Sequence, residues 1–302
     1  MHYRRQILGV NVDFGLSYED AITKIEQLIL EKVPGRYICT TNPEFIFDAQ
    51  TDDEFRNIIN SADLSVPDGS GILYANAFLE RTSKIFANNK YEYAVKTFIE
   101  GIKVGLSVVE RPEELHATIT GVELTNRLAA LSAKKKYTLY LLGGGRFDLG
   151  NLSTDMASET ANILSSKYPG INIIGGTSKF NREPKDDEAT VDCIKKEMRE
   201  KGVSNIDILL VAYNHGYQDK WIVRNAHKIP ATVSMGVGRT FALLTGYQPK
   251  EPIFIENLNL SWLYRLFTQP ARYKRILKAF PVFPCKVYEN NLKQYITSQK
   301  IS

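Results

Sequence analysis

The chain has 302 residues, a formal net charge of +4, 43% hydrophobic residues and 24% charged residues. These values are typical of a globular protein, and they exclude wholesale disorder and an integral membrane protein. A chain of this length is expected to form one large domain with at most a smaller appended unit.

The first residues place two arginines before a short apolar run that polar residues soon interrupt. We therefore expect a strand over residues 6–10 and no export signal. No stretch approaches the roughly 20 uninterrupted apolar residues that span a bilayer. The three cysteines are odd in number and far apart, which favours free thiols in the cytoplasm. They are Cys39, Cys193 and Cys285.

Strand-like and helical segments alternate through most of the chain. Strands are expected over residues 36–41, 63–67, 137–144, 171–176, 206–213 and 231–237. Helices are expected over residues 18–32, 45–62, 155–167 and 184–201, and from residue 218. This alternation predicts an α/β fold with a mostly parallel sheet and helices on both faces.

Ligands of such sheets bind beyond the carboxyl ends of the strands. Chemistry is therefore expected in the loops that follow the predicted strands. These loops comprise residues 40–44, 67–71, 143–145, 213–216 and 236–240.

Two segments depart from the alternation. Residues 79–116 form a mixed, partly basic stretch that predicts an insertion or flap, helical over 91–103. From residue 247 prolines separate short helical segments, so we expect a domain over 1–246 and a helical appendage over 247–302.

The predicted appendage carries nine Lys or Arg residues against three acids. Its basic residues are interleaved with aromatic and aliphatic ones, a mixture typical of segments that lie in a membrane interface. A docked helix pair with a solvated basic face is the alternative. Arginines in this segment could also clamp a diphosphate through paired hydrogen bonds.

Asp68 stands in the sequence VPDGSG, between a predicted strand and a helix expected to begin near residue 72. One interpretation is that its carboxylate caps that helix. The other is that it acts as a base at the mouth of the sheet and deprotonates an acceptor hydroxyl. The local sequence leaves both open.

Thr40 and Asn42 end the second predicted strand of the chain, just before Pro43 begins a helix. Two short neutral side chains at a strand end can hydrogen-bond sugar hydroxyls, and they can equally be simple helix caps.

Gly143 and Gly144 follow another predicted strand and would let backbone N–H groups approach a pyrophosphate. A plain strand-to-helix turn is the alternative. The chain lacks the GxxxxGK[ST] pattern of P-loop proteins and the Asp-x-Asp pair of many metal-dependent transferases. Its four histidines have no metal-ligand spacing, so neither a metal nor a cofactor is expected.

Read in order, these segments resemble the WecG/TagA/CpsF glycosyltransferase family. Its members transfer a sugar, often N-acetylmannosamine, from a UDP-sugar to an acceptor linked to undecaprenyl diphosphate. The resemblance covers nearly the whole chain and is carried by ILGVNVDFGLSYEDAITKI, TTNPEFIFDA, DLSVPDGSG, TGVEL, LLGG, VAYNHGYQDKWI, MGVGRTFALLTG and SWLYRLFTQPARYKR.

The resemblance implies a Rossmann-like domain with a C-terminal membrane-targeting appendage, and a homo-oligomer. It implies that Asp68 is the catalytic base and that Thr40 and Asn42 line the reaction centre. The other implied site residues are Gln218, Gly143, Gly144, Gly236, Gly238 and Arg239 for substrate, and Arg265, Arg272 and Arg275 for the lipid diphosphate.

The chain departs from the family pattern mainly on the donor side. Ala117-Thr118 replaces a Glu-Arg pair, residues 214–219 replace G-x-P-K-Q-E, and Ala242 replaces an acid. Arg239 could supply a phosphate contact instead. The segment 79–116 is also longer than the family's usual loop.

We therefore predict an inverting, metal-independent glycosyltransferase, peripheral on the inner face of the cell membrane. It would move N-acetylmannosamine or a related hexose from a UDP-sugar to a polyprenyl-diphosphate-linked sugar for cell-surface polysaccharide or teichoic acid. The alternative is a non-catalytic protein that binds a lipid diphosphate or a nucleotide sugar. A nucleic-acid partner is not expected, because no motif beyond charge supports one.

Overall fold

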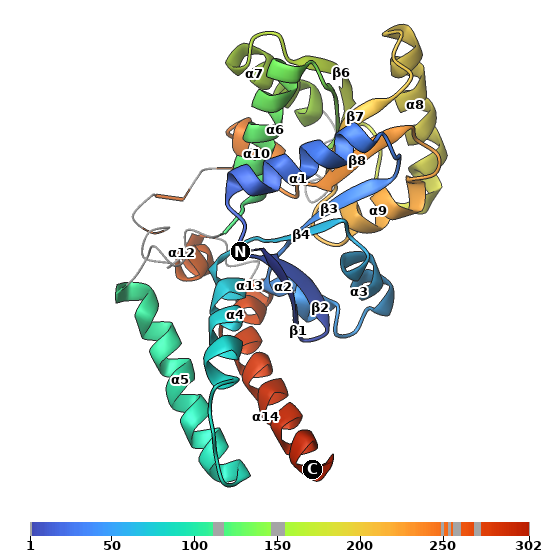
Figure 1. Cartoon of the computed structure of the whole chain (residues 1–302). Helices are drawn as coiled ribbons and strands as arrows, with labels where there is room; N and C mark the ends of the chain where they lie inside the picture. Colours follow the sequence, from blue (N-terminus) through green and yellow to red (C-terminus); the bar gives the residue numbers. More distant parts are fainter. Residues whose placement is uncertain are drawn as a thin grey trace.

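A six-stranded parallel sheet, in the order β4-β3-β8-β7-β5-β6, forms the centre of the molecule (Figure 1). The computed structural model describes residues 2–110, 118–145, 155–248, 251–252, 255, 261–268 and 273–301. The strands are β3 (Arg36–Thr41), β4 (Leu64–Pro67), β5 (Thr138–Gly143), β6 (Asn172–Thr177), β7 (Ile206–Ala212) and β8 (Ala231–Gly236). Each agrees with its predicted range to within one residue at either end.

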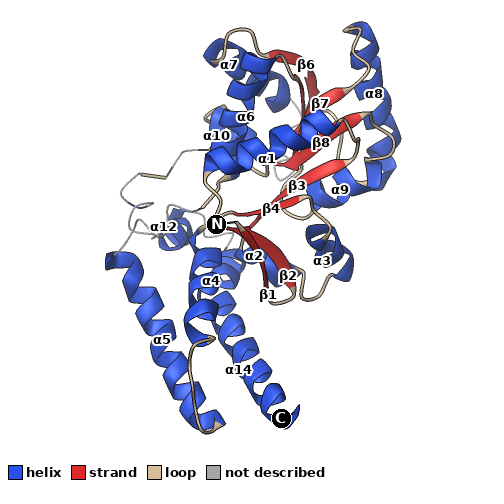
Figure 2. Cartoon of the chain, viewed as in Figure 1, coloured by secondary structure: helices blue, strands red, loops and turns tan. Residues whose placement is uncertain are grey.

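Helices cover both faces of this sheet, as the alternating pattern predicts (Figure 2). One face carries α1 (Tyr18–Glu31), α6 (Gly121–Lys135), α7 (Met156–Lys167) and α10 (Thr240–Leu244). The other carries α8 (Asp187–Glu200), preceded by the short turn η2 (Pro184–Asp186), and α9 (Tyr217–Asn225). Strand β5 shows why both faces are covered, because Leu139 and Leu141 enter one core while Tyr140 and Leu142 enter the other.

The single helix predicted over residues 45–62 is instead two helices. These are α2 (Pro43–Asp48) and α3 (Asp53–Asn60). Each has its own cap, since Asn42 accepts from the backbone at the start of α2 and Asp52 accepts from the Phe55 N–H at the start of α3. Two capping side chains ten residues apart therefore divide the predicted helix.

The strand predicted over residues 6–10 is wrong. The chain forms a separate antiparallel hairpin, β1 (Tyr3–Ile7) and β2 (Val10–Phe14), with Leu8 and Gly9 at the turn. Both turn residues have positive φ, and Leu8 is not a residue whose sequence signals such a turn. Buried Asp13 on β2 joins the hairpin to the large sheet by accepting from the Ser65 N–H at 2.8 Å.

A third core joins the hairpin, α2 and α3 to helices from distant parts of the chain. These are α4 (Ser70–Thr82), α5 (Lys90–Glu110) and α14 (Phe283–Ile301). The helix predicted over 91–103 lies within α5. In Figure 1, α4, α5 and α14 extend away from the sheet as one helical group.

The C-terminal segment also contains α12 (Ser261–Thr268), α13 (Tyr273–Leu277) and the short turn η4 (Lys278–Val282). Its last helix is firmly docked, since Tyr93 of α5 stacks on Tyr295 and donates to Asn291 at 3.0 Å. The domain boundary at 246/247 stays a prediction. Of the helices that the structure describes, none has the length and apolar character needed to cross a membrane.

Candidate active site

The loops after β3 and β4 lie side by side, because Thr41 and Pro67 are paired in the last register position of these strands. Asn42 and Asp68 are therefore neighbours at the carboxyl edge of the sheet. The Asp68 N–H donates to the Thr41 carbonyl at 2.8 Å, which ties the two loops together. The start of α4 also packs tightly on the Asn42 loop, since a side chain at Gly71 would approach the Pro43 ring to 2.7 Å.

Asp68 does not occupy the N-cap position of α4. Helix α4 begins at Ser70, two residues earlier than expected, and Gly69 occupies the N-cap position. Gly69 has φ +99°, a conformation that favours glycine and turns the chain directly after the carboxylate. Half-buried Asp68 thus precedes the helix at the strand end, the position expected of a base at the mouth of the sheet.

Thr40 is buried where β3, β8 and the start of α6 meet. Its hydroxyl lies 3.4 Å from the Gly236 carbonyl, to which it donates. A side chain at Gly121 would come within 4 Å of Thr40, so α6 begins directly against this residue. The position lies at the carboxyl edge, one residue before the end of the strand.

Asn42 is a helix cap, one of the two interpretations that its sequence left open. Its Oδ1 accepts from the N–H groups of Glu44 at 3.0 Å and Phe45 at 3.1 Å. The amide oxygen is therefore committed to α2, and the Nδ2 group is what Asn42 can offer to a sugar hydroxyl.

Gln218 holds the loop that follows β8. Its side chain is buried, and Oε1 accepts from the Gly238 N–H at 2.8 Å. It also lies flat on Gly236, where a Cβ would come within 2.4 Å of Nε2. Gln218 therefore shapes the loop that carries half-buried Arg239. Its contact with substrate, implied by the resemblance, stays a prediction.

Gly143 and Gly144 close the gap between β5 and β7, both with φ between +84° and +89°. A side chain at Gly143 would meet Ala212 and the Tyr213 ring within 3.0 Å. The Gly144 N–H donates to the Ala212 carbonyl at 2.8 Å, so it is already used by the backbone. These contacts favour the plain-turn interpretation over a pyrophosphate cradle at Gly144.

Of the three predicted diphosphate-binding arginines, the structure describes the side chain of Arg275 alone. Arg272 and the side chain of Arg265 lie outside the described residues. Arg275 reaches the Asn42 loop, where its Nε and Nη2 donate to the two carboxylate oxygens of Glu44, with Nη2 at 2.7 Å. The appendage thus contacts the carboxyl edge of the sheet.

A cluster that the sequence analysis missed lies beside this pair. Nε2 of His215 is 2.9 Å from Asp48 Oδ2, and Lys278 donates to Asp48 Oδ1 at 2.9 Å. Burial opposes ionisation of Asp48, but these two hydrogen bonds outweigh it and lower its pKa. The signal available in the sequence was the position of His215 in a strand-end loop; its partner lies 167 residues away.

Glu44, Asp48 and His215 have ligand atoms within 4.8 Å of one another, so they could hold a metal ion. However, Arg275 already faces Glu44 and Lys278 already faces Asp48. Both carboxylates are therefore neutralised by the appendage, and a cation there would have to displace these side chains.

Asp219, next to Gln218, is a second residue that the sequence analysis missed. It is 1% exposed, and Cys39 approaches it with Sγ at 3.7 Å from Oδ1. Its Oδ2 has no hydrogen-bond partner among the described residues. Burial raises the pKa of this carboxyl to about 7.

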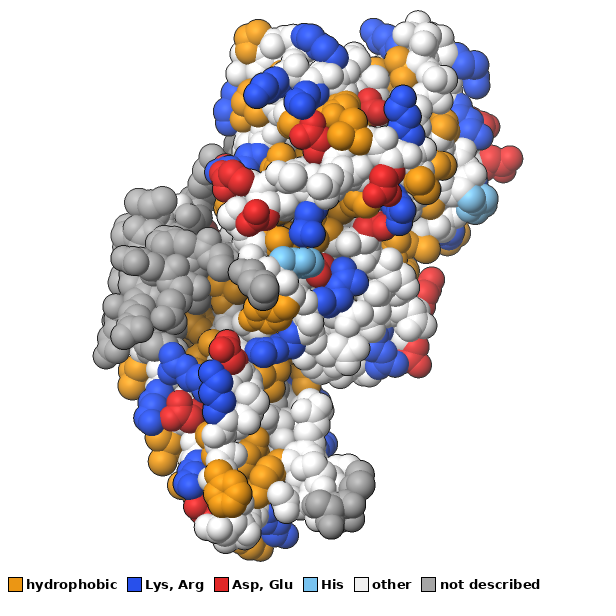
Figure 3. Space-filling model, in the orientation of Figure 1, with side chains coloured by type: hydrophobic (Ala, Val, Ile, Leu, Met, Phe, Trp, Pro, Cys, Tyr) orange, Lys and Arg blue, Asp and Glu red, His pale blue; other side chains and the backbone are white. Residues whose placement is uncertain are grey.

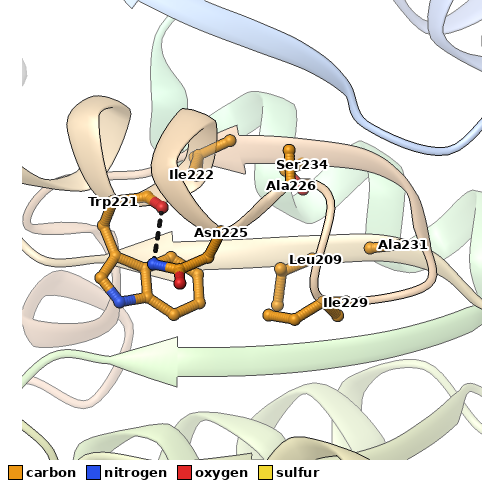
Figure 4. Close-up of a pocket in the computed structure, with 8 residues that line it drawn as sticks. All are labelled: Leu209, Trp221, Ile222, Asn225, Ala226, Ile229, Ala231 and Ser234. Carbon is orange, nitrogen blue, oxygen red and sulfur yellow. Dashed lines mark hydrogen bonds between the residues drawn. The ribbon is translucent and has the colours of Figure 1, made fainter. Parts of the chain in front are cut away.

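A small void lies away from this site, beneath α9 (Figure 4). Leu209, Trp221, Asn225 and Ser234 are among its lining residues, and Asn225 donates to the Trp221 carbonyl at 3.1 Å. Its lining comes from the packing of α9 on β7 and β8, not from the strand-end loops. It is too small to serve as a substrate pocket.

Comparison with known proteins agrees with the ordered motifs of the sequence. Residues 5–93 and 97–297 match the Glycosyl transferase WecG/TagA/CpsF family. The chain belongs to this family. It is therefore a glycosyltransferase, which confirms the resemblance found in the sequence. The three residues between the matched segments lie in α5.

Two WecG/TagA/CpsF relatives share one name, N-acetylglucosaminyldiphosphoundecaprenol N-acetyl-beta-D-mannosaminyltransferase. The relative from Bacillus subtilis (strain 168) is 25% identical over 256 residues, which are 85% of this chain and 80% of that protein. The relative from Staphylococcus aureus (strain NCTC 8325) is 24% identical over 251 residues, or 83% of this chain and 79% of that protein.

Proposed function

We propose that this glycosyltransferase moves N-acetylmannosamine or a related hexose from a UDP-sugar to a polyprenyl-diphosphate-linked sugar. The observation that carries the proposal is that Asp68 and Asn42 are neighbours and that Arg275 lies close to them. Arg275 is held there by Glu44, which stands two residues after Asn42 in the sequence. A carboxylate and a guanidinium at one sheet edge suit an acceptor that bears both a hydroxyl and a diphosphate. The names of both relatives include an acceptor of this class.

In the proposed mechanism, Asp68 takes the proton of the acceptor hydroxyl as its oxygen attacks the anomeric carbon of the donor. The carbon–oxygen bond to UDP breaks on the opposite side, so the configuration at that carbon inverts. The proton ends on Asp68 and the electron pair leaves with the UDP diphosphate. Backbone N–H groups and guanidinium groups stabilise the departing charge.

Donor recognition is assigned to the loop after β8, because Gln218 fixes its backbone and Arg239 lies in it. A guanidinium can hold a phosphate through paired hydrogen bonds, and this supports Arg239 as the donor-side cation. Because this chain has Ala242 at a position where the family pattern has an acid, its contacts with the donor nucleotide should differ from those of the typical members.

The protein is proposed to act at the inner face of the cell membrane, in cell-surface polysaccharide or teichoic acid synthesis. Its acceptor is a lipid, and the segment 247–302 has a net charge of +6, from nine basic and three acidic residues. A basic surface binds the anionic headgroups of that leaflet. A homo-oligomer is part of the proposal on the family resemblance alone.

A UDP-release assay over a panel of UDP-sugars, with and without a soluble diphospholipid acceptor analogue, tests this function. We expect acceptor-dependent release with one donor, N-acetylmannosamine or a close relative. Analysis of the product by nuclear magnetic resonance should show an inverted anomeric configuration. Release from no UDP-sugar in the panel, or a retained configuration, would contradict the proposal.

A further inference from the structure

Helix α5 has two apolar faces, and only one of them is covered by the described part of the chain. Tyr93, Thr97 and Val104 are buried on the inner face, which packs against α4 and α14. The outer face carries large apolar side chains that are between 46% and 73% exposed. They are Tyr91, Val95, Phe98, Ile99, Ile102 and Leu106. We call this set the outer stripe.

The outer stripe is continuous along the helix. Apart from the adjacent Phe98 and Ile99, its members follow one another at three- and four-residue steps. At 100° per residue they fall within about 100° of the helix circumference, opposite the inner face. Phe86, in the turn before α5, is 80% exposed. In Figure 3, hydrophobic side chains gather over this projecting helical part of the molecule, with Lys and Arg beside them. An exposed apolar surface of this kind marks a site of interaction.

The charge around the outer stripe favours a lipid surface over a protein partner. Helix α14 packs along α5 and has three Lys residues against one Glu, a net charge of +2. On α5 itself, Lys96 and Lys103 form ion pairs with acids one turn away, so the charges beside the stripe on this helix cancel. An apolar face beside a basic helix matches the acyl and headgroup regions of an anionic bilayer.

The position of α5 in the chain gives this surface a link to the reaction site. Helix α4 starts two residues after Asp68 and leads directly into α5, and the two helices pack together at Gly101 and Phe78. None of the described helices can cross a membrane. A helix lying on the bilayer through the outer stripe would hold the Asp68 loop at a fixed height above the lipid-linked acceptor.

We propose that the outer stripe of α5 is a membrane-docking surface that inserts its side chains into the interface of an anionic bilayer. The choice of lipid as occupant rests on the proposed function, because the acceptor proposed there is membrane-bound. The sequence pattern predicted membrane contact by the appendage, whereas here α5 supplies the apolar part of the contact and the appendage the basic part.

Binding of the full-length protein to vesicles of phosphatidylglycerol and phosphatidylcholine tests the proposal. The double variant Val95→Ser/Ile102→Ser should weaken cosedimentation roughly tenfold or more, because two inserted aliphatic side chains are lost. The matched control Leu30→Ser/Val33→Ser removes two similarly exposed side chains from the other end of the protein, on and just after α1, and should bind as the wild type does. Equal binding by the outer-stripe variant would overturn the proposal.

Two further measurements separate docking from the alternatives. A tryptophan in Ile102→Trp should be quenched by brominated phosphatidylcholine, whereas one in Leu30→Trp should not. If instead the wild type is a dimer without lipid and Val95→Ser/Ile102→Ser makes it a monomer with unchanged vesicle binding, the occupant is a second copy and the proposal fails.

Transfer to the water-soluble acceptor analogue should be unchanged in the outer-stripe variant. If the wild type transfers no sugar but the outer-stripe variant still loses vesicle binding, the docking proposal stands and the proposed function fails.

Discussion

Arg275 and Glu44 are joined by two hydrogen bonds although 231 positions separate them in the sequence. This pair connects the basic C-terminal segment to the loop that holds Asn42. Because Asn42 lies beside Asp68, the pair brings a guanidinium of the appendage to the edge of the proposed reaction centre.

Replacing Arg275 with Ala should lower kcat/KM for the lipid-linked acceptor by about 10- to 100-fold, because a charged hydrogen-bond donor to the diphosphate is lost. UDP affinity should not change. Glu44→Gln should cost less, about 3- to 10-fold, since the arginine remains but is less firmly held. Arg275 is 46% exposed, so the free energy of unfolding should change by less than about 1 kcal/mol. Lys274→Ala is the neighbouring control, and full activity of Arg275→Ala would contradict the assignment.

Asp68→Asn should reduce sugar transfer by about 10²- to 10⁴-fold, because the amide cannot take the acceptor proton. UDP binding, measured by titration calorimetry, should stay within about twofold of the wild type. Glu80→Gln, on the helix α4 that follows Asp68, is the control, since it removes an exposed carboxylate remote from the strand ends. If Asp68→Asn transfers sugar at the wild-type rate, Asp68 is not the catalytic base.

Gln218→Met keeps the size of a buried side chain but removes the acceptor of the Gly238 N–H. We expect the free energy of unfolding to fall by about 1–3 kcal/mol in urea titrations, the cost of an unsatisfied buried donor. The KM for the UDP-sugar should rise because the loop that carries Arg239 loses its support. Gln294→Met, an exposed position on α14, should change neither quantity. An unchanged KM beside the lost stability would limit Gln218 to a structural role.

Asp219 should make the protein less stable at alkaline pH. Burial raises its pKa to about 7, so the folded state keeps a proton that the unfolded state releases at lower pH. The bound proton stabilises the folded state fully at pH values below the pKa of the unfolded state. This contribution to the free energy of unfolding is lost as the pH rises through the folded-state pKa of about 7. Asp219→Asn should therefore stabilise the protein at pH 8 by about 1–3 kcal/mol and have a smaller effect at pH 5. Thermal unfolding at both pH values checks this. A larger gain in stability at pH 5 than at pH 8 would show that the pKa of Asp219 is not raised in the folded state.

Removal of divalent cations with EDTA should leave the rate of UDP release unchanged. The carboxylates of the Glu44, Asp48 and His215 cluster are already neutralised by Lys278 and Arg275, and the proposed leaving group is stabilised by arginines. A rate that falls with EDTA and returns with Mg²⁺ would refute metal independence. Repeating that titration with Asp48→Asn would then show whether this cluster holds the ion.

The position of Thr40, Asn42 and Asp68 at one edge of the sheet could be predicted, because each lies near the end of a strand and parallel strands present their carboxyl ends at the same edge. The pairing of β3 with β4, which makes Asn42 and Asp68 neighbours, came only from the structure. The cap position of α4 could not be read in the same way. Whether Asp68 or Gly69 occupies it depends on a single backbone angle, φ +99° at Gly69.

The sequence alone determined the parallel sheet, its strand limits and the family of the protein, because apolar runs, turn residues and ordered motifs are local properties of the chain. Only the tertiary structure decided the hairpin at Leu8, the use of the Gly144 N–H by Ala212, and the pairs Arg275–Glu44 and His215–Asp48. Each of these depends on which distant segments meet, and hydrogen bonds and ion pairs carry no periodicity that a sequence displays. The outer stripe of α5 depended on both. The sequence determined the spacing of its apolar residues, and the packing of α5 on α4 and α14 decided which of them are exposed.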